Sequence, residues 1–200
     1  MLAANMRRDP RVGGAVLDVC TGSGALAIAA ARAAARTVTA VDVSRRALVS
    51  TRISARLNGV RVRTRIGELL QAVPGEVFDM IVSNPPYLPS PGALPTRGAA
   101  RHTEAGPDGR LLLDRLIAQA PAHLCPGGVL MVTHSSVNGE QDTLERMRSA
   151  GLEPEVRERR RGPLGPMLAA RAPALEAAGL LEPGAREEEL LVIAGTAPRR

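Results

Sequence analysis

The sequence predicts an α/β protein, a three-layer sandwich in which helices cover both faces of a mostly parallel, seven-stranded sheet. Strand-like and helix-like segments alternate along the 200 residues, which is the pattern of a parallel sheet with helical crossovers. Ala15–Cys20 is a nearly continuous apolar run, as expected of a strand buried on both faces. Val60–Ile66 alternates apolar and polar residues instead, which indicates an edge strand.

The length suits a single domain, expected over residues 15–197 and preceded by a short polar tail at residues 1–14. Pro10 and the pair Gly13-Gly14 break regular structure in that tail. The expected strands are Ala15–Cys20, Val38–Val43, Val60–Ile66, Phe78–Val82, Val129–Thr133, Pro154–Arg159 and Leu190–Ala194.

Helices are expected between these strands. The segment Ala25–Ala35 is rich in alanine, the strongest helix former. Ser44 is in position to cap a helix that closes at Asn58-Gly59. Further helices are expected from Asp108, as its cap, to about Ala122, from a capping box of Asn138 and Gln141 to Gly151, and at Met167–Ala178.

The charge balance is basic, since all 26 basic residues are Arg and the formal net charge is +6. Such a charge favours nucleic acid or an acidic partner. The arginines are scattered, however, apart from Arg157–Arg161 and Arg199-Arg200, and the chain has one Tyr, one Phe and no Trp to stack on bases. A nucleic-acid surface is therefore the less favoured interpretation, and a solvated edge strand is the default for Arg157–Arg161.

Cys20 and Cys125 lie far apart and make no metal-binding spacing with the three histidines, so neither a metal site nor a disulfide framework is expected. No run approaches the length of about 18 apolar residues that a membrane span needs, and no apolar signal segment begins the sequence. We therefore expect a soluble, cytoplasmic protein that does not contact membranes.

A glycine-containing turn joins the first strand directly to a helix at Asp18–Gly24. Gly22 and Gly24 allow the backbone to approach a ligand at the amino end of that helix. A dinucleotide fingerprint would need glycines at Cys20 and Ala27, which weakens an NAD interpretation.

Asp42 ends the second strand, where a carboxylate can accept both hydroxyls of a ribose. The alternative for this region is purely structural: a tight turn at the glycines and a cap at Asp42 for the next helix.

The motif Asn84-Pro85-Pro86-Tyr87 directly follows the strand Phe78–Val82 and contains the only tyrosine of the chain. Open α/β sheets bind ligands at the carboxyl ends of their strands. A loop after a strand, with Tyr87 as a packing residue, is the structural alternative.

Three motifs together resemble those of the class I S-adenosylmethionine-dependent methyltransferases with a Rossmann-like sheet, and within them the HemK/PrmC group that methylates the glutamine of release factors. The motifs are Val16–Gly24, Ala40-Val41-Asp42 and Ser83–Tyr87.

The resemblance implies that Asp18 and the backbone at Gly22 and Gly24 hold the methionine part of S-adenosylmethionine, that Asp42 binds the ribose, and that Glu68 lies near the adenine amine. The full set of cofactor-binding residues that it implies is Asp18, Cys20, Thr21, Gly22, Gly24, Asp42, Val43, Glu68 and Asn84. The implied catalytic residues are Asn84, Pro85, Pro86 and Tyr87.

This chain departs from the family pattern at Cys20, where glycine is more usual, and at Glu68, where aspartate is more usual. Members that act on bacterial release factors usually carry an amino-terminal helical domain, whereas about 14 residues precede the first strand here. The chain therefore resembles either a shorter archaeal- and eukaryotic-like branch, which in some cases relies on a small activating partner protein, or a truncated member.

The chemistry of methylating an amide explains the motif. An amide nitrogen is a poor nucleophile because its lone pair is delocalised into the carbonyl. The side-chain oxygen of Asn84 and the carbonyl of Pro85 can accept hydrogen bonds from its two N–H groups and stabilise the charge that develops on nitrogen. The prolines hold these carbonyls in an extended geometry, and Tyr87 can pack on the planar target group or on the cationic reaction centre.

The motif itself leaves the acceptor open. A protein glutamine, in the Gly-Gly-Gln loop of a peptide chain release factor, is the first hypothesis. An exocyclic amine of a nucleic-acid base is the second, and a partner-dependent or inactive binding module is the third.

The loop Leu88–Pro107 is expected to face the substrate. Arg101 and Glu104 within it are more simply read as solvated side chains than as substrate contacts. His134 follows a strand and is expected to have a structural role rather than to act as a base.

Overall fold

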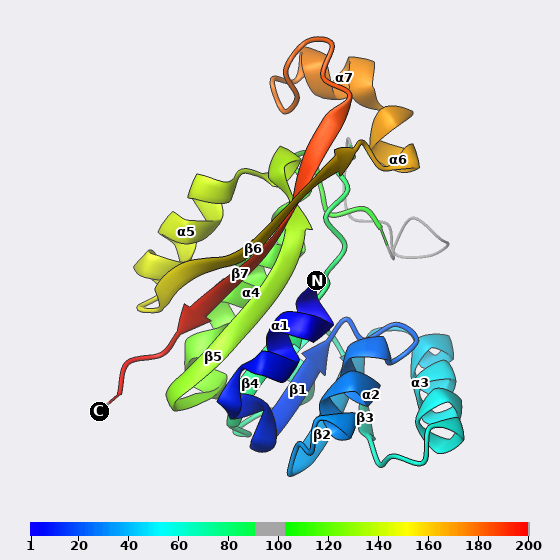
Figure 1. The fold of residues 1–200 in the computed structure, drawn as a ribbon, viewed down its shortest axis with the longest axis vertical. Coiled ribbons are helices and arrows are strands. Elements are labelled where there is room, and N and C mark those ends of the chain that lie inside the picture. The colour runs from blue at the N-terminus through cyan, green and yellow to red at the C-terminus, as the bar shows by residue number, and fades with distance from the viewer. Residues whose placement is uncertain (91–102, 200) are drawn as a thin grey trace.

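A seven-stranded sheet with the order β3-β2-β1-β4-β5-β7-β6 forms the middle layer of the molecule (Figure 1). The computed structural model describes residues 1–90 and 103–199. Every neighbouring pair of strands from β3 to β5 is parallel, and β7 runs antiparallel to both β5 and β6. The predicted three-layer, mostly parallel α/β fold is thereby confirmed.

All seven predicted strands are present, but β5, β6 and β7 are longer than the sequence predicts and β3 is shorter. The strands are β1 (Ala15–Val19), β2 (Thr37–Asp42), β3 (Arg63–Ile66), β4 (Phe78–Ser83), β5 (Leu124–Ser135), β6 (Glu153–Pro163) and β7 (Glu187–Thr196). The α-helices are α1 (Leu2–Arg8), α2 (Ala25–Arg32), α3 (Arg45–Leu57), α4 (Leu111–Gln119), α5 (Glu140–Ser149), α6 (Pro166–Ala169) and α7 (Ala172–Ala177). Short 3₁₀ turns are η1 (Pro10–Gly13), η2 (Leu69–Ala72), η4 (Ala120–His123) and η5 (Ser136–Asn138).

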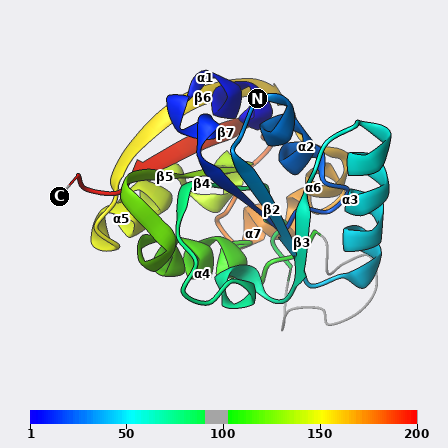
Figure 2. The same ribbon diagram turned by 90° about the horizontal axis from the view of Figure 1, so that it is seen from below.

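Two separate apolar cores lie on the two faces of the sheet, because successive side chains of a strand point to opposite faces. In β1, Leu17 belongs to the core beneath α4 and α5, whereas Val16 belongs to the core beneath α1 and α2. The same alternation holds in β7, where Leu191 and Val192 separate in this way. Figure 2 shows α1 on one side of the sheet and α4 and α5 on the other.

The first 14 residues are not a tail. Residues 2–8 form α1 and residues 10–13 form η1, and Leu2, Met6 and Val12 are buried in the core on the α2 face. Leu2 and Met6 are four residues apart and so lie on one face of the helix. The prediction of a polar tail was wrong because a seven-residue helix is too short to show a convincing apolar period.

Two helix caps also differ from the prediction. The Asp108 side chain accepts a hydrogen bond from the backbone N–H of Arg110 at 2.9 Å, but α4 begins later and has no side-chain cap. Gly139, not Asn138, is the cap residue of α5. Ser44, in contrast, caps α3 as predicted, accepting from the N–H of Ala47.

The segment between β6 and β7 forms two short helices instead of the one expected at Met167–Ala178. They lie beyond the end of the sheet in Figure 1. A third, smaller apolar cluster holds them there, and it includes Leu88 from the segment after the Asn84–Tyr87 motif. Its members are Leu88, Val137, Leu164, Leu168, Ala172, Leu175 and Leu181.

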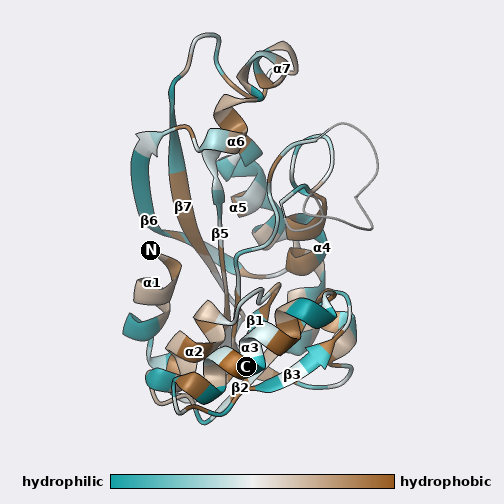
Figure 3. Ribbon diagram, turned by 90° about the vertical axis from the view of Figure 1, so that its right-hand side faces the viewer, coloured by the Kyte–Doolittle hydropathy of each residue, from teal (hydrophilic) through white to brown (hydrophobic). Residues whose placement is uncertain are grey.

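The edge strands β3 and β6 are polar (Figure 3), whereas β1 and β4 in the middle of the sheet are mostly buried and apolar. The predicted edge strand is the real edge strand β3, although its paired part begins only at Arg63. Within residues 1–90 and 103–199, no helix has both the length and the apolar character needed to cross a bilayer.

Candidate active site

The carboxyl ends of β1 and β4 meet where the strand order reverses. Strands β2 and β3 lie beyond β1, and β5, β7 and β6 lie beyond β4. Val19 and Ser83 are paired across these two strands, and the Ser83 hydroxyl donates to the Val19 carbonyl at 2.7 Å. Open α/β sheets bind ligands in the crevice at such a switch point. Cys20 and Asn84, the next residues along the two strands, therefore stand on either side of the crevice.

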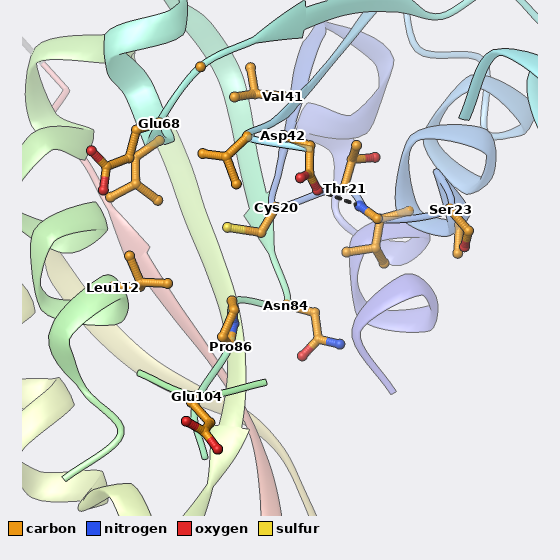
Figure 4. A pocket seen from close by; sticks show the side chains of 16 residues that line it. Cys20, Thr21, Ser23, Val41, Asp42, Glu68, Asn84, Pro86, Glu104 and Leu112 are labelled. Carbon is orange, nitrogen blue, oxygen red and sulfur yellow. Dashed lines mark hydrogen bonds between the residues drawn. The ribbon is translucent and has the colours of Figure 1, made fainter. Parts of the chain in front are cut away.

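A cleft of about 470 Å³ opens there, a size that suits a small molecule. Figure 4 shows Asp42 and Asn84 facing the cavity, with Glu68 across from Thr21. The residues that line it are Cys20, Thr21, Gly22, Ser23, Ala25, Leu26, Val41, Asp42, Val43, Gly67, Glu68, Leu69, Asn84, Pro86, Glu104 and Leu112. Of the predicted cofactor residues, all but Asp18 and Gly24 line this cleft.

Gly22 and Gly24 have different roles in the turn. Both have positive φ angles, of +56° and +86°. A Cβ at Gly22 would meet nothing within 4 Å, so the backbone there is open to the cleft. A Cβ at Gly24 would lie 2.8 Å from the Cγ2 of Thr51, so this glycine is needed for packing on α3 rather than for lining the cleft.

Cys20 explains why glycine is more usual at its position. Its φ is +59°, in the left-handed region that costs a residue with a Cβ roughly 1–2 kcal/mol. Burial, with the negative charges of Asp42 and Asp18, raises the pKa of the Cys20 thiol to about 12. The thiol therefore stays protonated and acts as a small apolar wall of the cleft.

Asp18 supports the turn from behind and does not reach the cleft. It is fully buried, and its Oδ2 accepts from the Thr21 hydroxyl at 2.6 Å and from the N–H of Ala27 at 2.9 Å. Burial raises its pKa to about 7, against the lowering effect of those two hydrogen bonds. In this structure Asp18 holds the turn in position, and its predicted contact with the cofactor stays a prediction.

Asp42 connects the turn to the cleft. Its Oδ2 accepts from the N–H of Gly22 at 3.0 Å, the dashed line in Figure 4, and its Oδ1 accepts from the N–H of Ser44 at 2.8 Å. The carboxylate therefore both fixes the glycine turn and presents a negative group to the cavity. The structural and the ligand-binding interpretations of Asp42 are compatible.

Glu68 lines the far side of the cleft, where its Oε1 accepts from Arg115 at 2.6 Å. Leu69, beside it, has a φ of +47° and also lines the cleft. Backbone strain of this kind concentrates at functional sites.

A second cleft, of about 310 Å³, lies on the other side of the motif. Asn84 and Pro86 line both clefts, while Pro85 and Tyr87 line only the second. The second cleft is lined by Asn84, Pro85, Pro86, Tyr87, Leu88, Thr103, Gly165, Pro166, Met167, Leu168 and Glu188. Two residues thus form the partition between a cleft at the glycine turn and a cleft at the motif.

Tyr87 is half-buried in this second cleft. Burial, together with the negative charge of Glu188, raises the pKa of its phenol. The hydroxyl is consequently protonated at neutral pH and available as a hydrogen-bond donor.

Asn138 anchors the motif, a role that its sequence context does not reveal. Its Nδ2 donates to the carbonyl of Tyr87 at 2.7 Å and to that of Asp108 at 3.0 Å. Gly109 passes so close that a Cβ there would overlap the Tyr87 carbonyl. The predicted capping box is wrong because the Asn138 amide bridges two loops instead of capping a helix.

The segment after the motif is tied down by charge. Arg171, just before α7, donates to the carbonyl of Pro89 at 2.7 Å and pairs with Glu104, which also accepts from the Ser90 hydroxyl. Glu104 is therefore not the solvated loop residue that was expected, and it lines the first cleft. Arg101, and most of the predicted loop Leu88–Pro107, lie outside the described residues.

Two further predictions concern residues outside the clefts. His134 is fully buried, with Nδ1 bonded to the Ser135 carbonyl at 2.8 Å and Nε2 to the Thr143 hydroxyl at 3.1 Å, which is a structural role. Strand β6 carries the arginines Arg157, Arg159, Arg160 and Arg161. Each of them lies within 4 Å of a carboxylate of this chain. Among residues 1–90 and 103–199, no three metal-ligating side chains cluster as a metal site.

The amino-terminal half matches a known protein family. The family model of the methyltransferase small domain matches residues 1–96. The chain is 33% identical over 149 residues to the "Putative protein N5-glutamine methyltransferase MJ0928" of Methanocaldococcus jannaschii, covering 74% of this chain and 75% of the relative.

Two bacterial relatives are closer in sequence but longer. A release factor glutamine methyltransferase of Deinococcus radiodurans is 40% identical over 148 residues, 71% of this chain and 52% of the relative. A ribosomal protein uL3 glutamine methyltransferase of Bordetella pertussis is 41% identical over 148 residues, 69% of this chain and 48% of the relative. This chain therefore spans about half the length of these two relatives.

The fold matches that of a solved structure, the Mtq2–Trm112 complex of E. cuniculi, described as responsible for the methylation of the eRF1 translation termination factor. The TM-score is 0.66 at 21% identity, and the match covers 98% of this chain and 92% of the other. Together with the glycine turn, Asp42 and the Asn84–Tyr87 motif around one switch point, these similarities show that the chain belongs to the HemK/PrmC family of class I glutamine methyltransferases.

Proposed function

We propose that this protein transfers a methyl group from S-adenosylmethionine to the side-chain amide nitrogen of a protein glutamine. The observation that carries the proposal is the partition between the two clefts, because Asn84 and Pro86 line both. A donor in the first cleft and an acceptor in the second would meet at these residues.

The first cleft fits S-adenosylmethionine. The backbone at Gly22 faces open space, so a ligand can approach where a side chain would otherwise lie. The carboxylate of Asp42 is available to ribose hydroxyls, and Glu68 is an acceptor suited to an adenine amine. Val43, Leu69 and Leu112 add apolar surface for a flat base. When bound, the cofactor supplies a methyl group activated by a positive sulfonium.

The motif would act on the acceptor. The Asn84 side chain is exposed to the clefts, and within the described residues it makes no hydrogen bond. Its oxygen and the Pro85 carbonyl would accept the two N–H groups of the glutamine amide and stabilise the positive charge that grows on nitrogen. The reaction forms one N–C bond and breaks one C–S bond, and the surplus proton leaves to water. No general base is needed before transfer.

The acceptor that we propose is the glutamine of the Gly-Gly-Gln loop of a peptide chain release factor. Relatives named for release factors and for a ribosomal protein share about the same identity with this chain, so both classes of protein belong in the test. A nucleic-acid base is less favoured, because each arginine of β6 lies within 4 Å of a carboxylate of this chain, which partly neutralises the positive charge of this strand.

We also propose that a small activating protein binds to an exposed apolar surface on helix α3. Helix α3 exposes an apolar stripe of Val49, Ile53 and Leu57, which are 50%, 56% and 82% exposed, and Ile66 of the edge strand β3 is also exposed. A Trm112-like protein co-expressed with this chain should co-purify with the wild type and be lost from Leu57→Asp. Co-purification that survives Leu57→Asp would rule out this surface as the docking site.

The main experiment incubates the protein and S-adenosylmethionine with a release factor, with a uL3-type ribosomal protein and with RNA, and maps any added methyl by mass spectrometry. We expect one methyl on the glutamine of the Gly-Gly-Gln loop. Asn84→Ala should lower transfer by at least about a hundredfold, a scale typical of removing one group that stabilises transition-state charge, and leave the Kd for the cofactor nearly unchanged. Absence of a methyl on any glutamine would reject the proposal, and an equal loss of binding and transfer in Asn84→Ala would make Asn84 structural.

A further inference from the structure

Glu188 is a buried carboxylate at the second cleft with one oxygen unused. It lies at the start of β7 and is 9% exposed. Its Oε1 accepts from the N–H of Gly165 at 2.8 Å, which fixes the side chain against the segment between β6 and β7. Its Oε2 is buried and has no hydrogen-bond partner among the described residues.

The neighbouring glutamates show that this arrangement is particular to one position. Side chains alternate along a strand, so Glu187 and Glu189 point the other way and pair with Arg161 and Arg159 on the surface. Glu188 alone of the three points inward and lines the cleft that contains Asn84 and Tyr87. An unpaired buried acceptor is costly unless something satisfies it.

We propose that Glu188 binds an N–H donor of the acceptor peptide beside the glutamine being methylated, and so determines which peptides enter the second cleft. The inference rests on the proposed function. A peptide chain carries a main-chain N–H at nearly every residue, and a carboxylate is the strongest acceptor that a protein side chain can offer it. Since Oε2 is covered in the free protein, the carboxyl group must turn toward the cleft as the peptide binds.

The wall of the cleft around Glu188 packs against the segment that follows the motif. Gly165, Pro166, Met167 and Leu168 form the same side of the cleft, and Leu168 belongs to the apolar cluster that packs α6 and α7 against Leu88. The wall is therefore attached to the segment that directly follows the motif. The negative charge of Glu188 also reaches Tyr87 across the cleft, so the two polar groups face the same bound peptide.

The test compares Glu188→Gln with Glu187→Gln. Glutamine at 188 keeps an oxygen for the N–H of Gly165 but replaces Oε2 with an NH₂ group that cannot accept. We expect the KM and the Kd for a Gly-Gly-Gln peptide to rise by about ten- to a hundredfold, the scale of one lost charge-assisted hydrogen bond. The cofactor Kd and the Tm should stay close to wild type, and Glu187→Gln, on the surface, should change none of these.

Peptides methylated at single main-chain nitrogens identify the donor. We expect one flanking position at which this modification weakens binding to the wild type much more than to Glu188→Gln, since that hydrogen bond is already absent in the variant. If no position shows this difference, or if Glu188→Gln leaves peptide binding unchanged, Glu188 does not contact the peptide. A parallel loss of Tm and cofactor binding would also overturn the proposal, by making Glu188 structural.

Peptide binding is measured by calorimetry with S-adenosylhomocysteine present, so the result does not depend on transfer. A wild type that binds the peptide through Glu188 but never methylates it would defeat the proposed function and leave this inference standing. If the wild type and Glu188→Gln methylate the glutamine equally well, the proposed function stands and this inference is rejected.

Discussion

The two clefts are built in different ways. The first is made mainly of short connections in the first 69 residues, where each strand runs directly into the turn that lines the cavity. The second is assembled from four distant parts of the chain, the motif, Thr103, the segment 165–168 and Glu188. Side chains that bond to backbone carbonyls, such as Asn138 and Arg171, hold these parts together.

This difference means that the two clefts should respond separately to mutation. The first depends on local backbone conformation and on two buried aspartates, Asp18 and Asp42. The second depends on long-range anchoring of the motif. A substitution at an anchor should therefore weaken acceptor binding while cofactor binding survives, and the two predictions below test each half in turn.

The largest effect is expected at Gly109, in the acceptor half. Its φ is +72°, and a Cβ there would overlap the Tyr87 carbonyl and the Asn138 amide. We expect Gly109→Ala to cost about 3 kcal/mol or more of unfolding free energy, since strain and overlap add. It should also raise the acceptor KM at least about tenfold, because the motif must move. Urea unfolding and steady-state kinetics measure the two effects.

Gly75→Ala is the matched control for Gly109→Ala. Gly75 has a nearly identical φ of +70°, but a Cβ there would meet nothing within 4 Å. In Gly75→Ala the backbone strain should therefore be the only cost, lowering the unfolding free energy by about 1 kcal/mol. The kinetics should not change. Equal losses in the two variants would mean that the contact with Tyr87 is unimportant, and a weakened cofactor Kd in Gly109→Ala would contradict the independence of the two halves.

A smaller effect, in the cofactor half, is expected from Asp18. Its pKa is about 7 in the folded protein against an ordinary value of 3.8, so folding favours the protonated form. Its contribution to stability is fully present below a pH of about 4 and is lost as the pH rises through about 7.

Asp18→Asn, which cannot titrate, removes that pH dependence. Between pH 4 and pH 8 the wild type should lose about 2 kcal/mol or more of unfolding free energy relative to Asp18→Asn. Urea unfolding of both proteins across this range measures the difference, and parallel pH profiles would show that Asp18 does not titrate there.

The same division explains what could be predicted from the sequence. The glycine turn, Asp42 and the helix capped by Ser44 depend on residues within a few positions of one another, and their patterns are visible in the sequence. The position of Asp18 at the end of the first strand is also visible in the sequence, but its hydrogen bonds to Thr21 and Ala27 are not. The contacts of Asn138 with Tyr87 and of Arg171 with Pro89 join residues that are 51 and 82 positions apart in the sequence, and Glu188 contacts Gly165 more than 20 positions away. No local pattern in the sequence marks such contacts. Gly109 alone had a signal, since it follows Pro107-Asp108 in a turn-like triplet.

The shared lining of Asn84 and Pro86 has a consequence for ligand design. Since Asn84 and Pro86 line both cavities, a molecule that carries a nucleoside at one end and an amide at the other is a candidate to bind in both. Linking two weak binders makes the second contact intramolecular, and this raises affinity by about 10²- to 10⁴-fold when the linker matches the span. The two shared residues that would bring donor and acceptor together thus also make the protein a target for a bivalent inhibitor.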